Sequence, residues 1–97
     1  MLPAARLGDM TAHGTPLGPG PGSANVLIEG RPAWRAGMDT HACPLVSGVV
    51  PHGAGVAPMG STTVLINNVP AVRMTDTIVE ATAPNTVVAG APTVLIG

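Results

Sequence analysis

The feature that most constrains the fold of this chain is a short unit that occurs three times along it. A Gly-Ser pair, a Val-Leu-Ile run and a Pro-Ala-x-Arg run follow one another across residues 22–35, and the same series returns across residues 60–73 with constant spacing. A third Pro-Ala-x-Arg opens the chain at residues 3–6, and a third Val-Leu-Ile stands at residues 94–96. Repetition of this kind indicates a fold built from copies of one supersecondary unit.

The order of the runs indicates that the three units close into a ring. In both complete copies, three residues separate the isoleucine from the proline that follows it. If the two ends of the chain are joined, the path from Ile96 to Pro3 also passes three residues, namely Gly97, Met1 and Leu2. We therefore predict a pseudo-threefold ring in which the termini meet at the third junction.

Each unit has the pattern of two short strands. The Val-Leu-Ile runs are rich in β-branched residues and are bounded by turn-forming residues, while the proline of Pro-Ala-x-Arg suits the start or edge of a strand. No stretch keeps a 3.6-residue apolar period over the length of a helix. The 97 residues are enough for one domain. We expect an all-β fold of short strands and tight turns, with residues 1–97 forming a single domain.

Composition excludes several classes of function and shows that the fold has few bulky core residues and no disulfide to stabilise it. The net charge is −1 with four arginines and no lysine, so there is no basic patch for nucleic acid. No apolar run approaches the ~20 residues of a membrane span, and the first residues lack the pattern of a secretory signal. Trp34 is the only aromatic residue, and the single Cys43 excludes an internal disulfide. A chain this small then needs another kind of cross-link to stabilise its fold.

The candidate for this cross-link is a bound metal ion. The chain contains three histidines and one cysteine, which together make a full tetrahedral shell for zinc. The four candidate ligands are His13, His41, Cys43 and His52. His13 follows Asp9 by four residues and Cys43 follows Asp39 by four, so two candidates occupy equivalent places in two units. We predict one structural zinc ion, with iron as the alternative metal.

The position in the third unit that corresponds to His13 and Cys43 is held by Glu80, four residues after Asp76. A carboxylate there has two interpretations. It could accept a hydrogen bond from a ligand imidazole, as residues next to metal ligands commonly do. We favour the other interpretation, in which Glu80 lies in solvent on the surface.

An arginine and an aspartate follow one another in every unit and can form ion pairs that hold the corners of the ring. We expect these pairs to be exposed, and exposed pairs contribute little to stability. The pairs are Arg6 with Asp9, Arg35 with Asp39, and Arg73 with Asp76.

The three Pro-Ala-x-Arg runs, one of them literally Pro-Ala-Ala-Arg, together with the four metal candidates resemble the PAAR-repeat proteins. These proteins are spike tips of type VI secretion systems and related contractile injection machines. The resemblance covers essentially the whole chain. It implies a cone of short strands with a blunt base and with zinc near its vertex, held by His13, His41, Cys43 and His52. We expect a bare tip, since no toxin domain follows the last repeat in this sequence.

The resemblance also implies a partner and a route. The base would sit on a trimeric β-helical spike of the VgrG type, with one copy per trimer, and the free tip would be a monomer. The tip would assemble in the cytoplasm, contact the target membrane transiently on delivery and carry effector cargo where there is any. The recurring apolar runs are candidates for the docking face, with core packing as the alternative. Their residues are Val26, Leu27, Ile28, Val64, Leu65, Ile66, Val94, Leu95 and Ile96.

Two other functions fit some of the same residues. A small zinc-dependent enzyme would need a general base beside the metal, but no H-E-x-x-H or deaminase signature is present. Four candidate ligands also leave no open position for water, which a catalytic zinc keeps. A metal-sensing or redox protein would use Cys43 as a reactive thiol. We therefore expect no enzymatic activity and a structural role.

Overall fold

The computed structural model describes residues 1–47, 50–80 and 84–97, with all side chains in these ranges except those of residues 43–47 and 50–52. These ranges contain short strands and no helix, which confirms the predicted all-β fold, and hence no helix able to cross a membrane. The strands are β1 (Leu2–Ala4), β2 (Pro19–Gly20), β3 (Leu27–Ile28), β4 (Arg31–Pro32), β5 (Thr40–Ser47), β6 (Val50–Gly55), β7 (Leu65–Ile66), β8 (Val69–Pro70), β9 (Thr77–Val79), β10 (Pro84–Thr86) and β11 (Ala91–Ile96).

Three antiparallel pairs with the same register carry the repeated runs, and we call them the base hairpins. They are β3–β4, β7–β8 and β1–β11. Their isoleucines have equivalent partners: Ile28 pairs with Arg31, Ile66 with Val69, and Ile96 with Leu2. In the first two hairpins the two turn residues have positive φ, as a two-residue type I′ turn requires. In the third, the two termini occupy the place of the turn, so the prediction that they meet there is confirmed.

The middle residues of the three Pro-Ala-x-Arg runs form the centre of the ring. The N–H of Ala5 donates to the carbonyl of Val72 at 2.9 Å, that of Val72 to Trp34 at 3.1 Å, and that of Trp34 to Ala5 at 3.0 Å. All three side chains are buried. A closed cycle of three backbone hydrogen bonds satisfies polar groups that burial would otherwise leave costly. The predicted pseudo-threefold axis passes through this cycle.

Two apolar clusters form the core, one at the base hairpins, which we call the lower cluster, and one around Trp34, which we call the upper cluster. The lower cluster contains the three isoleucines of the base hairpins, with the alanines of the Pro-Ala-x-Arg runs. The upper cluster surrounds Trp34 and includes Leu17, Ile78 and Val87. Because each unit is too small to bury a face alone, the core exists only when all three units are assembled.

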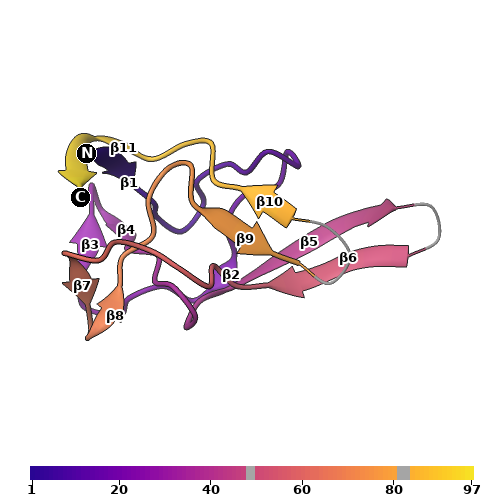
Figure 1. Ribbon diagram of the computed structural model, residues 1–97, viewed down its shortest axis with the longest axis horizontal. Coiled ribbons are helices and arrows are strands. Elements are labelled where there is room, and N and C mark those ends of the chain that lie inside the picture. The colour runs from indigo at the N-terminus through magenta and orange to yellow at the C-terminus, as the bar shows by residue number, and fades with distance from the viewer. Residues whose placement is uncertain (48–49, 81–83) are drawn as a thin grey trace.

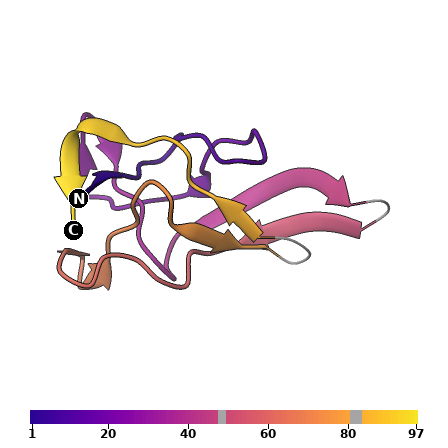
Figure 2. The same ribbon diagram turned by 45° about the horizontal axis from the view of Figure 1, so that its top comes forward.

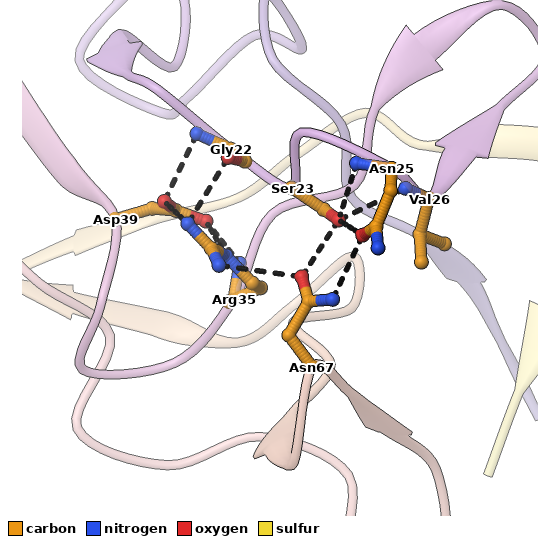
Figure 3. Close-up of polar contacts among 7 residues, drawn as sticks. All are labelled: Gly22, Ser23, Asn25, Val26, Arg35, Asp39 and Asn67. Atoms are coloured by element: carbon orange, nitrogen blue, oxygen red, sulfur yellow. Dashed lines mark hydrogen bonds and ion pairs between the residues drawn. The ribbon is translucent and has the colours of Figure 1, made fainter.

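Ion pairs at the corners join the units, two of them largely buried and the third, Arg73 with Asp76, half-buried, so our expectation of exposed pairs is wrong. Figure 3 shows the Arg35 guanidinium held by both oxygens of Asp39, whose side chain is fully buried and also accepts the N–H of Gly22 at 2.9 Å. Arg35 then reaches Asn67 in the turn of the β7–β8 hairpin, at 3.3 Å. The carboxylate accepts backbone and side-chain donors together, so it orders the corner as well as pairing charges. The other two pairs repeat the same fork.

The molecule is elongated, with principal extents of 38 × 23 × 21 Å. The base hairpins gather with both termini at one end, which we call the base, and the β5–β6 hairpin extends from the opposite, narrow end (Figure 1). Figure 2 shows the same separation after a 45° turn. The arrangement therefore places the repeated Val-Leu-Ile runs and the second unit's histidine- and cysteine-bearing strands at opposite ends.

Candidate functional site

At the narrow end, three hairpins of unequal length come together, one from each unit. The first spans residues 10–16, the second is β5–β6 and the third is β9–β10. Backbone hydrogen bonds tie them to one another: Ala12 donates to Thr86 at 2.8 Å, and Val79 donates to Val56 at 3.0 Å. Side chains far apart in the sequence thereby converge at the root of β5–β6.

Glu80 stands between two of the predicted metal ligands. Its carboxylate oxygen Oε1 lies 3.2 Å from Nδ1 of His13, and Oε2 lies 3.6 Å from Nε2 of His41. The Glu80 side chain is 0% exposed. Our expectation that Glu80 lies in solvent is therefore wrong, and the interpretation as a partner of the ligand imidazoles agrees with the geometry. Burial of a carboxylate is tolerated because two imidazoles face it.

Asn85 holds this carboxylate in place from the neighbouring strand β10. Its amide Nδ2 donates to Glu80 Oε2 at 2.9 Å, while its Oδ1 accepts the backbone N–H of His13 at 3.1 Å. Asn85 is itself buried. Nothing in the local sequence marks Asn85 as part of a site, and only the pairing of β9 with β10 brings it beside Glu80.

His41 is buried, and its two ring nitrogens differ in their surroundings. Nε2 lies 3.1 Å from the hydroxyl of Thr15, a residue that sequence reasoning also missed. Nδ1 is buried without a hydrogen-bond partner among the described side chains. Burial lowers the pKa of His41 below its usual range, against the opposing effects of Glu80 and of the Pro16 carbonyl. The imidazole is therefore kept neutral, which is the form that binds metals.

Cys43 and His52 have described backbones, but their side chains lie outside the described part of the chain. Cys43 on β5 is paired with Gly53 on β6, so His52 is the next residue along the partner strand. Their backbones thus lie side by side on the hairpin that also carries His41. Among the side chains that the structure does describe, no group of three or more has metal-holding geometry.

The residues present nevertheless fit a zinc ion. A buried imidazole nitrogen without a partner, a buried carboxylate against two imidazoles, and a thiol on the same hairpin are the donor chemistry that zinc takes. Of the predicted ligands, the structure brings His13 and His41 together around Glu80 and places the backbones of the other two on adjacent strands.

At the base, each Val-Leu-Ile run divides between core and surface. The isoleucines Ile28, Ile66 and Ile96 are 8%, 7% and 8% exposed, whereas the leucines Leu27, Leu65 and Leu95 are 60%, 59% and 47% exposed. The valines Val26, Val64 and Val94 are partly buried against the lower cluster. Alternation along a strand accounts for the division. Both interpretations of these runs therefore apply, to different residues of the same run.

A family model of the PAAR motif matches residues 7–79, which is more than half of the chain. The chain belongs to the PAAR motif family. The match spans the first two Val-Leu-Ile runs, two of the three Pro-Ala-x-Arg runs and all four metal candidates. A search of curated proteins finds no match to this chain.

PAAR motif proteins are associated with the spike tips of contractile injection systems and are structural components there rather than enzymes. This association suggests a different kind of contact for each end of the molecule. Three equivalent leucines at the base are suited to contact with another protein, and the buried His41 and Glu80 beside His13 at the narrow end are suited to a structural metal.

Proposed function

We propose that this PAAR motif protein is the tip of an injection spike, seated through its base on a trimeric β-helical protein of the VgrG type. The observation that carries the proposal is the exposure of one leucine in each of three equivalent hairpins around a single axis. A trimer presents every surface feature three times. One copy of a chain with internal threefold symmetry can therefore match all three subunits at once.

The exposed leucines supply the energy of this contact. Burying a leucine side chain contributes roughly 1.5–3 kcal/mol, so three together can support a stable complex. The base also gives the spike what an open trimeric β-structure lacks, since the last strand edges of such a trimer need a cover to avoid pairing with other chains. A monomer with one apolar face can both bind the trimer and cover its exposed strand edges.

At the other end we propose one zinc ion held by His13, His41, Cys43 and His52. When bound, zinc would tie the hairpins of the first two units together with no position open for substrate. The role of the residues is then mechanical: they close the narrow end so that it resists local opening when it is driven through a membrane. Buried Glu80 and Asn85 support the proposal, because they hold two of the four proposed ligands, His13 and His41, in position.

Copurification with a candidate trimeric spike tests the base. The wild-type chain should bind with one copy per trimer, measured by native mass spectrometry. Replacing Leu27, Leu65 and Leu95 together with glutamine should weaken binding about tenfold per leucine, since ~1.4 kcal/mol corresponds to a factor of ten. A matched control replaces three exposed apolar residues outside the base hairpins, by Met10→Gln, Met38→Gln and Val88→Thr. Equal binding by both triple variants would overturn the docking face.

The two other functions are tested on the metal-loaded protein. A catalytic zinc would change the absorption of the cobalt-substituted protein when anions are added, whereas a four-ligand site would not respond. A redox or sensing protein would expose Cys43 to rapid alkylation, whereas a metal-bound thiolate would react slowly. We expect neither anion response nor rapid labelling. Metal analysis of the same sample distinguishes zinc from iron.

The route follows from the same role. We propose that the tip assembles in the cytoplasm, touches the target membrane only during delivery and leaves the cell through the apparatus, with effector cargo where a partner supplies it. Its appearance in culture medium should depend on a functional contractile sheath. Equal release from a sheath-deficient strain would contradict this route.

A further inference from the structure

We infer that Thr15 and Glu80 hold His41 in the tautomer with its proton on Nε2, so that Nδ1 is the nitrogen presented to a metal ion. The inference rests on the metal site proposed above. It concerns two residues that position a ligand without binding the metal themselves, and it predicts which atom of His41 binds. The sequence offered this role for Glu80 as one of two interpretations and gave no sign of Thr15.

A chain of buried hydroxyl groups defines the direction of the hydrogen bonds. The Thr11 hydroxyl lies 2.7 Å from the carbonyl oxygen of Thr15, and a carbonyl can only accept, so the Thr11 proton is used there. The two hydroxyl oxygens of Thr11 and Thr15 are 3.1 Å apart. Their hydrogen bond must then use the proton of Thr15. The Thr15 oxygen is left as an acceptor toward His41 Nε2, at 3.1 Å, and Nε2 must carry the proton.

Glu80 favours the same tautomer independently. Its Oε2 lies 3.6 Å from His41 Nε2, which is beyond a good hydrogen bond but close enough for a carboxylate to favour a proton on the facing nitrogen. Asn85 donates to that oxygen at 2.9 Å and fixes its position. The remaining nitrogen of His41, Nδ1, keeps its lone pair, and it is the buried atom without a partner among the described side chains.

The same carboxylate predicts the opposite nitrogen for His13. Oε1 of Glu80 lies 3.2 Å from His13 Nδ1, so the proton belongs on Nδ1 and the lone pair on Nε2. One carboxylate therefore positions two ligands from two different units. It also balances charge, because a zinc ion with one thiolate and three neutral imidazoles carries a single positive charge in a buried place. Loss of such a partner typically lowers metal affinity 10- to 100-fold.

The nitrogen bound in each ring can be read directly from the metal-loaded chain. Long-range ¹H–¹⁵N spectra of the zinc protein, and ¹¹³Cd couplings after exchange, distinguish metal-bound from protonated ring nitrogens. We expect binding through Nδ1 of His41 and through Nε2 of His13. Binding of His41 through Nε2 overturns this inference and leaves the metal site intact. A chain that takes up no metal overturns the metal site and the inference with it.

Substitution tests the two positioning residues by competition with a chelator. We expect Thr15→Val and Glu80→Gln each to weaken zinc binding about 10- to 100-fold. The controls carry the same chemical changes away from the histidines: exposed Thr62→Val and Glu29→Gln, which contacts Arg6 and Thr93, should leave zinc affinity unchanged. Unchanged affinity in both positioning variants would overturn the role. If a variant does not fold, the nitrogen assignment in the wild-type protein still decides.

Discussion

The base and the narrow end are built from the same three units, yet one is nearly symmetric and the other is not. At the base, each unit supplies a hairpin of the same register and one exposed leucine. At the narrow end, the corresponding hairpins differ in length, and the equivalent positions hold a histidine, a cysteine and a glutamate. Repetition is kept at one end and given up at the other.

The difference follows from what each end would contact. A trimeric partner is matched best by three equal contributions. A tetrahedral ion has four ligand positions, so three equal units cannot fill it, and one unit must supply more. In this chain the second unit carries His41, Cys43 and His52, the first carries His13, and the third supplies Glu80, which touches imidazoles.

Metal removal should have the largest effect on stability, and it tests whether the base and the narrow end fold cooperatively. Structural zinc sites contribute about 10–16 kcal/mol in model peptides, comparable to the ~5–15 kcal/mol stability of a whole domain. We expect Cys43→Ser or chelation to unfold the chain or to lower its melting temperature more than any other change. Circular dichroism with parallel metal analysis measures this.

Amide exchange locates the loss of structure after metal removal. The N–H groups of Ala5, Trp34 and Val72 report on the ring near the base, because they form its closed hydrogen-bond cycle. We expect them to lose protection when the metal leaves, and zinc returned to the sample should restore it. Full protection without metal would mean that the base folds alone and that the narrow end is an independent addition.

The symmetric part of the fold could be predicted from the sequence, and the asymmetric part could not. Constant spacing between runs reveals equivalent hairpins and the meeting of the termini. Burial of Glu80 and of Asp39 is invisible to the same reasoning, because charged residues are seldom buried and a single sequence does not show the partners that make an exception. Asn85 and Thr15 contact their functional neighbours only through pairing of distant hairpins, so their roles needed the structure.

Trp34→Ala should have the next largest effect. Trp34 fills the axis where the other units place Ala5 and Val72, so the ring is symmetric in backbone but not in volume. Removing the indole should cost about 3–5 kcal/mol in unfolding free energy, because a large cavity remains. Val72→Ala removes only two carbons and should cost about 2 kcal/mol, at ~0.8 per buried carbon with a small cavity term.

Urea unfolding of both variants measures these costs on one scale. Equal losses at the two positions would show that the axial cluster closes around whichever side chain is removed. The difference in size between Trp34 and Val72 would then not affect the free energy of unfolding. The metal site alone would distinguish the narrow end from the base.

The corner ion pairs should rank next, graded by burial. Asp39→Ala leaves the Arg35 guanidinium and the Gly22 N–H without their acceptor in a fully buried place. We expect a loss of about 3 kcal/mol, the lower end for breaking a buried pair. Asp76→Ala should cost less, about 1 kcal/mol, because Arg73 and Asp76 are 21% and 13% exposed and water screens their charges more than it screens the buried pair. Urea titrations at high and low salt compare them, and equal costs would contradict the grading.

Thr75→Gly should have the smallest effect and the opposite sign. Thr75 has φ of 80°, where the equivalent residues Gly8 and Gly37 have 90° and 74°. Each donates its N–H across to the next hairpin in the same way, from Gly8 to Leu17 and from Thr75 to Val87. A β-branched residue is strained there, at a cost of about 1–3 kcal/mol. Glycine should relieve the strain and lose ~0.5–1 kcal/mol in entropy.

The net gain should be about 1 kcal/mol, which raises the melting temperature of a chain this size by roughly 4–8 °C. The reverse change, Gly37→Thr, is the matched control, since a Cβ at Gly37 would meet nothing within 4 Å and only backbone strain can act. It should destabilise by a similar amount. Stability changes of opposite sign and similar size in the two variants would show that the corners share the same backbone conformation and the same strain. A loss on Thr75→Gly would instead mean that the Thr75 side chain stabilises its own unit, extending the asymmetry of the narrow end into the ring.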